Sequence, residues 1–380
     1  MKKEWAILNP AGAKRIVATK DLPGNTWRKV LSENDCRIEV CTSPAALAVN
    51  KLRSALGTTC DGVIGQLNET WDNDLLSALH AAGGRVYCNY AVGFDNVDVR
   101  AATSLGIAIG NTPEVLTEAT AEMGVALTFA AARRVTEADD FMRAGKFTGW
   151  RHSLFLGELL TGRTLGVVGA GRIGSAYARM MVEGHKMSLM YFNTKPNTEL
   201  ENYVASYGKF LGGVGQSSVT CRRASTIEEL LSAADVIALF PALNEKTFHL
   251  LDGKRLSLMK EHAVLVNLSR GPVIDETALV QHCRTHPNFR AGLDVYEKEP
   301  KTAQGLLALS NVVLAPHLGS ATLWTREAMA TLAARNVAAV LNGFPAWDGG
   351  SVLKFLGESP PKAAPSIVNA RGVGMISLES

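Results

Sequence analysis

The segment Gly169-Ala170-Gly171-Arg172-Ile173-Gly174 constrains this chain more than any other, because it has the glycine spacing of a dinucleotide-binding turn. The apolar run Thr164–Val168 precedes it and predicts a strand, and Ser175–Met181 follows it with helical character. In such a turn the first glycine permits a tight bend, the second lets backbone approach a pyrophosphate, and the third lets the helix pack on the strand. Phosphate charge then lies at the N-terminal amides of that helix. The alternative is a purely structural glycine turn.

The glycine turn lies near the middle of 380 residues, a length that predicts two domains with separate cores. Strand-like and helical segments alternate on both sides of it, which is typical of α/β layering with parallel sheets. We therefore predict a Rossmann-type dinucleotide-binding domain inserted into a flavodoxin-like α/β substrate-binding domain. The predicted boundaries are 1–118 for the first part of the substrate-binding domain, 119–316 for the Rossmann domain, and 317–380 for the return and the C-terminal tail.

Apolar runs and turn residues predict the following elements. Strands are expected at 37–40, 62–65, 85–88, 188–192, 236–239, 263–268, 290–295 and 312–314, and helices at 74–82, 118–132 and 325–341. The polar, glycine-containing stretch 208–225 is expected to be a surface excursion, and the proline-rich stretch 358–365 to be irregular.

Composition excludes several classes of function. The formal net charge is only +3 and no concentrated Lys/Arg tract is present, so nucleic-acid or anionic-membrane binding has no electrostatic basis. No apolar stretch approaches 18 residues, which argues against a membrane span. The six cysteines lack CxxC or zinc spacing, which predicts no metal site and reduced thiols in an intracellular compartment, with a disulfide or reactive thiol as the alternative.

The two ends of the given sequence were compared with known targeting signals. Met1-Lys2-Lys3 leads into Trp5–Leu8 without a signal-peptide pattern. The final residues Ser377-Leu378-Glu379-Ser380 form neither an ER-retention nor a peroxisomal tripeptide.

Three polar loops follow predicted strands behind the glycine turn: Asn267–Gly271, Gly292–Pro300 and Pro316–Ser320. The carboxyl ends of strands are where open α/β sheets bind ligands. Taken singly, Arg270 is compatible with a surface ion pair, Glu299 with a solvated turn acid, and His317 with a structural histidine. Their occurrence in this order behind a dinucleotide turn indicates a shared site.

The residue types fit hydride transfer to a 2-keto acid. Negative charge develops on the carbonyl oxygen, and a histidine such as His317 supplies a proton there near neutral pH. A carboxylate beside it, Glu299, favours the imidazolium and fixes its orientation. Arg270 can bind the substrate carboxylate with a geometry that lysine cannot match. Backbone amides of the loop Ala91-Val92-Gly93, which follows another predicted strand, can hold the second carboxylate oxygen.

These residues resemble those of the D-isomer-specific 2-hydroxyacid dehydrogenase family over essentially the whole chain. In that family the arginine of N-x-x-R-G, the glutamate of G-x-D-V-x-x-x-E-P and the histidine of P-H form the catalytic set, which implies these roles for Arg270, Glu299 and His317. Glu299 also argues against formate dehydrogenases, which have glutamine there. Three segments are most similar to plant-type hydroxypyruvate reductases (glycerate dehydrogenases): Tyr90–Asp98, the insertion after Tyr203 that ends in Cys221–Ser225, and Ser366–Asn369.

The resemblance implies reduction of hydroxypyruvate to D-glycerate, with glyoxylate to glycolate as a side activity. The two domains would close around the substrate, and the active site would lie in the cleft between them. D-lactate, phosphoglycerate and phosphite dehydrogenases remain alternatives within the family, although no basic residues near Gly65-Gln66 or Ala91–Gly93 favour a phosphorylated substrate. A nucleotide-sensing transcriptional corepressor is the alternative from another class.

The resemblance also implies contacts and partners. A homodimer is expected, and Trp150 lies in a segment that reaches a partner's active site in related reductases; a domain-packing aromatic is the alternative. An organelle matrix, peroxisomal or mitochondrial, is the implied location, with the cytosol open.

The implied contacts involve two sets of residues. The substrate contacts are Ala91, Val92, Gly93, Arg270 and His317. The cofactor contacts are Thr120, Gly169, Gly171, Arg172, Ile173, Gly174, Asn193, Thr194, Lys195, Pro241, Asp294 and Gly319. Pro241 lies one place off the commoner family pattern.

The choice between the two nicotinamide cofactors depends on the residue after the second Rossmann strand. An acid there binds the ribose 2′-hydroxyl and repels a 2′-phosphate. This chain has Asn193-Thr194-Lys195, with Asn193 where plant-type relatives have aspartate. The resemblance favours NAD(H), whereas the loss of the repelling acid and the presence of Lys195 make NADP(H) acceptable.

Overall fold

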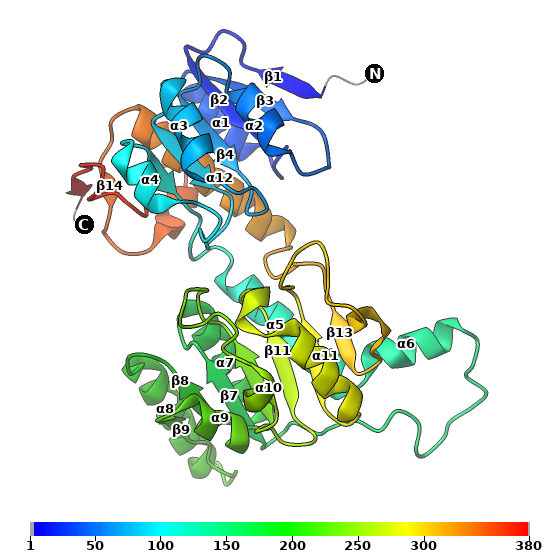
Figure 1. Ribbon diagram of the computed structural model, residues 1–380. Helices are drawn as coiled ribbons and strands as arrows, with labels where there is room; N and C mark the ends of the chain where they lie inside the picture. Colours follow the sequence, from blue (N-terminus) through cyan, green and yellow to red (C-terminus); the bar gives the residue numbers. More distant parts are fainter. Residues whose placement is uncertain (1–3, 379–380) are drawn as a thin grey trace. The chain divides into compact units, whose positions relative to one another are not determined.

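The computed structural model describes residues 4–378 (Figure 1). Predictions that depend on Met1-Lys2-Lys3 or on Glu379-Ser380 lie outside these residues. The chain forms two compact units, which we call unit 1 (Met1–Leu116 with Ser320–Ser380) and unit 2 (Thr117–Gly319). The predicted roles of the domains in binding substrate and cofactor stay predictions at this stage.

Unit 1 contains a six-stranded sheet in the order β1-β3-β2-β4-β5-β6, in which only β1 is antiparallel to its neighbour. The parallel part has the strand order of a flavodoxin-like sheet. Every residue of β4 and β5 is buried, as expected when helices cover both faces of a parallel sheet. The strands are β1 (Trp5–Leu8), β2 (Lys14–Ala18), β3 (Cys36–Cys41), β4 (Gly62–Gly65), β5 (Val86–Asn89) and β6 (Ala108–Gly110).

Helices from both ends of the chain build unit 1. The long helix α12 (Leu323–Leu341) packs on α1 and on β4 and β5, and most of its residues are buried. Its small side chains, mainly alanines, let it lie close to the sheet. The other elements are α1 (Thr26–Glu33), α2 (Val49–Leu56), α3 (Asn73–Ala81), α4 (Val99–Ser104), η3 (Val352–Leu356) and a small pair of strands, β14 (Ala346–Trp347) and β15 (Ser377–Leu378).

Unit 2 contains a seven-stranded parallel sheet in the order β13-β12-β11-β10-β7-β8-β9. Counted from β7, this is the Rossmann order with one further strand. The prediction of an α/β fold with parallel sheets and a Rossmann-type unit is therefore confirmed. The strands are β7 (Thr164–Val168), β8 (Ser188–Phe192), β9 (Cys221–Arg223), β10 (Val236–Leu239), β11 (Val264–Asn267), β12 (Arg290–Leu293) and β13 (Val312–Leu314).

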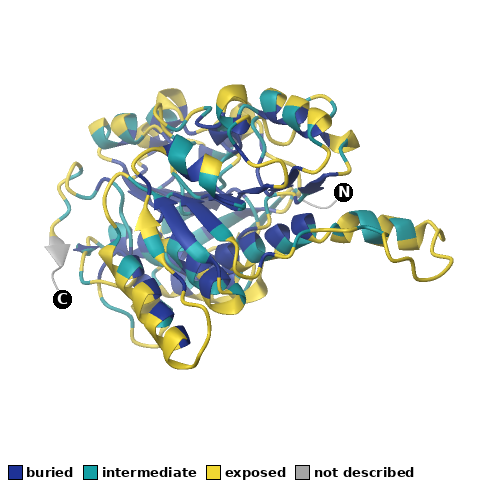
Figure 2. Cartoon of the chain, turned by 90° about the horizontal axis from the view of Figure 1, so that it is seen from below, coloured by how far each residue is buried: buried dark blue, intermediate teal, exposed yellow. Residues whose placement is uncertain are grey.

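Apolar helix faces cover both sides of this sheet, and its central strands are buried (Figure 2). One core joins α5, α7 and α8 to the sheet, and a second joins α9, α10 and α11 to the opposite face. In the first core the hydroxyls of Thr128 and Tyr177 are hydrogen-bonded at 2.8 Å, which satisfies two buried polar groups. The helices are α5 (Thr117–Ala132), α6 (Val135–Arg143), α7 (Arg172–His185), α8 (Thr198–Gly213), α9 (Ile227–Ala233), α10 (Gly253–Leu256), α11 (Glu276–Thr285), η1 (Gly271–Val273) and η2 (Leu306–Ala308).

The expectation of a surface excursion over 208–225 is wrong at both of its ends. Residues up to Gly213 complete α8, and Cys221–Arg223 form β9, the edge strand beside β8. Gly208 is needed because a Cβ there would lie 2.4 Å from the Val219 carbonyl oxygen, where the chain crosses the helix. The strand was hidden because an edge strand tolerates charged side chains such as Arg222 and Arg223.

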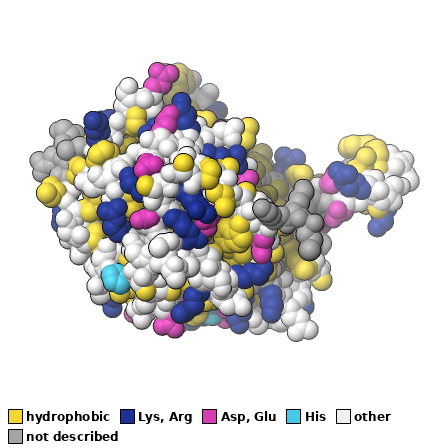
Figure 3. Space-filling model, turned by 90° about the horizontal axis from the view of Figure 1, so that it is seen from above, with side chains coloured by type: hydrophobic (Ala, Val, Ile, Leu, Met, Phe, Trp, Pro, Cys, Tyr) yellow, Lys and Arg dark blue, Asp and Glu magenta, His cyan; other side chains and the backbone are white. Residues whose placement is uncertain are grey.

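Three observations concern the surface charges, the helices and the thiols. On the face shown in Figure 3, Lys and Arg side chains are interspersed with Asp and Glu. Among residues 4–378, no helix combines the length and apolar character needed to span a bilayer. All six cysteines are free thiols, and only Cys221 is less than fully buried.

Candidate active site

The loops after β11, β12 and β13 contain Arg270, Glu299 and His317. These three strands are neighbours in the sheet of unit 2, so their carboxyl ends lie at one edge. There the structure brings Glu299 and His317 into contact, with His317 Nδ1 3.0 Å from Glu299 Oε2. With Nδ1 facing the carboxylate, Nε2 is the ring nitrogen that remains to face a substrate.

The backbone holds His317 in an unusual conformation. Its φ is +58°, a left-handed value that costs a non-glycine residue about 1–2 kcal/mol. The buried Asp294 stabilises this turn, because its carboxylate accepts hydrogen bonds from the amides of Leu318 at 2.6 Å and Gly319 at 2.7 Å. The His317 amide also donates to the Asp294 carbonyl at 2.9 Å. Asp294 therefore fixes the direction of the histidine.

The charge of Glu299 is set by its neighbours. Burial alone raises the pKa of this carboxyl group, but the hydrogen bond and charge of His317 lower it, as do the Tyr296 amide and the charge of Arg270. The net result is a pKa below the ordinary value. Glu299 is therefore a carboxylate at neutral pH, and it can accept a hydrogen bond from His317 Nδ1.

The Arg270 loop is anchored by its own backbone contacts. Asn267 Oδ1 accepts from the Ser269 amide at 3.0 Å, and Asn267 Nδ2 donates to the Arg270 carbonyl at 3.0 Å. The Arg270 side chain donates to the Ser269 carbonyl at 2.9 Å. Its charge also contributes to the low pKa of Glu299, which places the two side chains within electrostatic reach of each other.

The next residue, Gly271, joins the first two loops. A Cβ on Gly271 would lie only 1.8 Å from the Tyr296 carbonyl carbon, so the loop after β11 packs directly on the backbone of the loop after β12. The Tyr296 hydroxyl in turn donates to the Ala315 carbonyl at 2.9 Å, which connects the second loop to the third. No sequence pattern predicts these roles of Gly271 and Tyr296.

The glycine turn has the geometry that its spacing predicts. Gly169 has a φ of +91° and packs on the backbone of Phe240 and Pro241, and a Cβ on Gly174 would lie 2.3 Å from the Gly169 carbonyl oxygen. A Cβ on Gly171, in contrast, would meet no protein atom within 4 Å. Gly171 is also the N-cap of α7 and supplies no side-chain cap to its amides. These features fit a pyrophosphate at the start of α7.

Of the other predicted cofactor residues, Arg172 and Ile173 begin α7, and the rest fall into two groups. Thr120, Asp294 and Gly319 come together, because a Cβ on Gly319 would lie 3.2 Å from both Asp294 Oδ2 and Thr120 Cγ2. The other group is the Asn193–Lys195 loop, which follows β8.

Arg223 on β9 lies against the Asn193–Lys195 loop. Its guanidinium donates to the Asn193 carbonyl at 2.9 Å and to the Thr194 carbonyl at 3.0 Å. Sequence reasoning missed Arg223, because β9 itself was missed.

The predicted substrate loop, Ala91–Gly93, lies in unit 1 after β5. Its three carbonyls are bound by the Thr112 amide at 2.9 Å, by Asn111 Nδ2 at 2.8 Å and by Asn89 Nδ2 at 2.8 Å. Within residues 4–378, the amides of Val92 and Gly93 donate to no protein group. The loop is therefore held by its carbonyls and presents its amides, as carboxylate binding requires.

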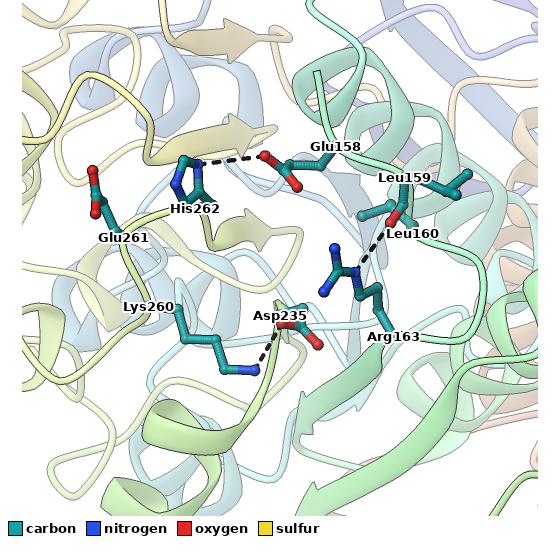
Figure 4. Close-up of a pocket in the computed structure, with 8 residues that line it drawn as sticks. All are labelled: Glu158, Leu159, Leu160, Arg163, Asp235, Lys260, Glu261 and His262. Carbon is teal, nitrogen blue, oxygen red and sulfur yellow. Dashed lines mark hydrogen bonds and ion pairs between the residues drawn. The ribbon is translucent and has the colours of Figure 1, made fainter. Parts of the chain in front are cut away.

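A separate cavity of about 420 Å³ lies at the opposite edge of the sheet of unit 2, where β7, β10 and β11 begin (Figure 4). Two pairs of acidic and basic side chains line it: Lys260 with Asp235 at 2.7 Å and His262 with Glu158 at 3.4 Å. Because ligands of open α/β sheets bind at the carboxyl ends of strands, this cavity is not the predicted site.

Comparison with known proteins gives three related findings. Residues 125–319 match the family model described as D-isomer specific 2-hydroxyacid dehydrogenase, NAD binding domain. The chain is 54% identical over 372 residues to the glycerate dehydrogenase of Cucumis sativus, covering 97% of each protein. It is 53% identical over 373 residues to the glycerate dehydrogenase of Arabidopsis thaliana that is named peroxisomal, again covering 97% of each.

A solved structure agrees with these relatives. The NADPH-dependent glyoxylate/hydroxypyruvate reductase of Sinorhizobium meliloti, in complex with NADP and malonate, superimposes with a TM-score of 0.68. The two sequences are 28% identical, and the match covers 88% of this chain and 95% of that one.

Proposed function

Because the chain belongs to the D-isomer specific 2-hydroxyacid dehydrogenases, we propose that it reduces hydroxypyruvate to D-glycerate, with glyoxylate to glycolate as a side activity. The observation that carries the proposal is the 3.0 Å contact between His317 and Glu299 in the unit that contains the dinucleotide turn. The choice of hydroxypyruvate is supported by the two plant relatives, both named glycerate dehydrogenase.

Each predicted side chain has a role in this reaction. The glycine turn would hold the pyrophosphate of a reduced nicotinamide cofactor, and that cofactor would supply the hydride for the keto carbon. His317 Nε2 donates a proton to the keto oxygen, and Glu299 holds the imidazolium through Nδ1. Arg270 binds the substrate carboxylate and polarises the carbonyl, and the amides of Val92 and Gly93 bind the second carboxylate oxygen.

For the cofactor, NAD(H) is the proposed preference and NADP(H) is also accepted. Asn193 carries no charge that would repel a 2′-phosphate, and Lys195 and Arg223 add two positive charges at the same loop. Initial rates with NADH and NADPH test this directly. In Asn193→Asp the NADPH rate should fall by about tenfold or more while the NADH rate holds, because one new repulsive charge opposes the phosphate. An unchanged NADPH rate would contradict the assigned role of the loop.

For the assembly, the proposed state is a homodimer. Helix α6 has no buried residue, and the segment after it exposes large apolar side chains, with Trp150 84% and Leu156 67% exposed. Figures 1 and 2 show this segment extending away from the sheet of unit 2. Exposed apolar surface of this kind marks an interface. Light scattering measures the mass, and Trp150→Lys should shift it toward the monomer; a wild-type monomer would contradict the proposal.

For the compartment, an organelle matrix is proposed, since one plant relative is named peroxisomal. Immunolocalisation of the untagged protein in its own cells tests this, and a uniformly cytosolic signal would contradict it.

The first experiment measures initial rates with hydroxypyruvate, glyoxylate and pyruvate. Hydroxypyruvate should be the best substrate, and His317→Ala or Arg270→Ala should lose most of the turnover while the fold survives. His262→Ala is the matched control, because this histidine lies in the same unit at the opposite edge of the sheet. Wild-type rates in either active-site variant would refute the assignment. Faster pyruvate reduction would favour a D-lactate dehydrogenase, and no turnover of any acid would favour a sensor.

A further inference from the structure

Unsatisfied buried polar atoms gather beside the predicted substrate loop of unit 1. Among the described residues, four buried side-chain atoms other than arginine nitrogens lack a hydrogen-bond partner. Three of them are Gln66 Nε2, Glu69 Oε1 and Thr112 Oγ1. Gln66 follows β4, Thr112 follows β6, and the Ala91–Gly93 loop follows β5, the strand between those two. Buried polar groups are nearly always paired in folded proteins, so such a group of unpaired atoms indicates a bound partner.

These loops are braced to one another. The Tyr90 amide donates to the Gly65 carbonyl at 2.9 Å, which joins the substrate loop to the turn that contains Gln66 and Glu69. Asn96 Nδ2 donates to the Glu69 carbonyl at 2.8 Å, and Asn89 Nδ2 donates to Asn96 Oδ1 at 2.9 Å. The unpaired atoms therefore belong to a fixed scaffold, as a preorganised binding site requires.

Glu69 is the clearest example of a buried side chain with an unpaired polar atom. Its side chain is only 3% exposed, and Oε2 accepts from the Gln66 amide at 3.1 Å and from Trp71 Nε1 at 3.3 Å. Oε1 has no partner. The Thr19 hydroxyl donates to the Ile64 carbonyl at 3.5 Å, and it lies close enough to the Glu69 carboxyl group to lower the pKa of that group. Burial raises the pKa of Glu69 in spite of opposing hydrogen bonds, as expected for a carboxyl group that the protein satisfies incompletely.

The two unpaired atoms of this turn are complementary in chemistry. Gln66 Nε2 is a donor and Glu69 Oε1 is an acceptor, only three residues apart. A hydroxyl group accepts one hydrogen bond and donates another, so it satisfies both atoms at once. A carboxylate only accepts, and a methyl group does neither.

We propose that Gln66 and Glu69 bind the C3 hydroxyl of hydroxypyruvate and so determine the preference for this acid over glyoxylate and pyruvate. This inference rests on the proposed function. Glyoxylate has no third carbon and pyruvate has a methyl group there, so both leave the donor and the acceptor unpaired. Discrimination of this kind is strong, because the cost of an unpaired buried group is added to the loss of the contact.

The test measures kcat and KM of Gln66→Leu and Glu69→Gln with all three acids, after circular dichroism has confirmed that each variant is folded. Hydroxypyruvate kcat/KM should fall by about tenfold to a hundredfold in each variant, mainly through KM, because one hydrogen bond to a buried hydroxyl is lost. The rates with glyoxylate and pyruvate should change less than about threefold. Asn68→Ala, an exposed position in the same turn, is the matched control.

The outcomes separate this inference from the proposed function. If the wild-type protein reduces hydroxypyruvate but neither variant changes its ratio to glyoxylate, the role of Gln66 and Glu69 is refuted and the function stands. Equal losses with all three acids show a structural role and also refute it. If the wild-type protein does not reduce hydroxypyruvate, the proposed function fails and the inference fails with it.

Discussion

Gly271→Ala is the most direct test of how the active-site loops are held. The added methyl carbon would lie 1.8 Å from the Tyr296 carbonyl carbon, 2.0 Å from its oxygen and 2.3 Å from the Glu297 nitrogen. All three are backbone atoms, so no side-chain rotation relieves the clash. Because carbon atoms pack at about 3.5 Å, the loops after β11 and β12 must separate by about 1.7 Å.

This separation has consequences for stability and for catalysis. Overpacking of this kind costs about 1–3 kcal/mol, and a unit of this size loses about 2–4 °C in Tm for each kcal/mol, so Tm should fall by about 2–12 °C. Glu299 moves with Tyr296, whose amide donates to Glu299 Oε1 at 3.1 Å. A displacement of about 1 Å in a catalytic group costs about a hundredfold in rate, so kcat/KM should fall by about that factor.

The assay compares thermal unfolding and hydroxypyruvate reduction with those of Gly184→Ala. Gly184 lies in α7, and a Cβ there would meet no atom within 4 Å. That control should keep its activity and gain less than about 1 kcal/mol, because Gly184 lies in the last turn of α7, where alanine still favours the helix over glycine. A Gly271→Ala protein with wild-type Tm and turnover would refute the direct packing of the two loops.

Three further predictions concern the cofactor turn, acid stability and the thiols. Gly171→Ala should keep the wild-type Tm, because the added methyl group meets no protein atom. The variant should bind NADH more weakly in a fluorescence titration, because the methyl group points into the space for the pyrophosphate. Undiminished NADH binding would contradict this. The pKa of Glu299 is lower in the folded protein than the ordinary carboxyl value, so its carboxylate form stabilises the fold. This stabilisation is present above the ordinary carboxyl pKa, and it is lost as pH falls through the pKa of Glu299 in the folded protein. The Tm advantage of the wild type over Glu299→Gln should therefore shrink in acid, and a pH-independent difference would argue against the His317 pair. Burial raises the pKa of Cys60, Cys88 and Cys283 to about 12, so these thiols should react with a disulfide reagent at pH 8 only on unfolding, and rapid labelling of the native protein would contradict their burial.

The parts of the site that the sequence predicted are those fixed by local rules. A buried parallel strand is a short apolar run, so β8, β10 and β13 could be located to the residue. The three polar loops follow from the rule that ligands bind at the carboxyl ends of strands. This rule did not predict β9, because an edge strand needs no apolar run, and the position of Arg223 on β9 was therefore not predicted either.

Sequence patterns also do not show whether a buried polar side chain has hydrogen-bond partners. Two glutamates show why this matters. Glu276 and Glu69 are 5% and 3% exposed. Glu276 is the first residue of α11 and Glu69 lies in the turn after β4, and at both positions a solvated acid is the default expectation. Glu276 Oε1 accepts from the Ala303 amide at 3.1 Å and Oε2 accepts from the Glu297 amide at 2.9 Å, so both oxygens serve to hold the loop after β12. Glu69 uses one oxygen in this way and leaves the other without a partner. Two glutamates that are equally buried can therefore have different roles, one structural and one in binding. The roles can be told apart only when the hydrogen-bond partners of each carboxylate oxygen are known.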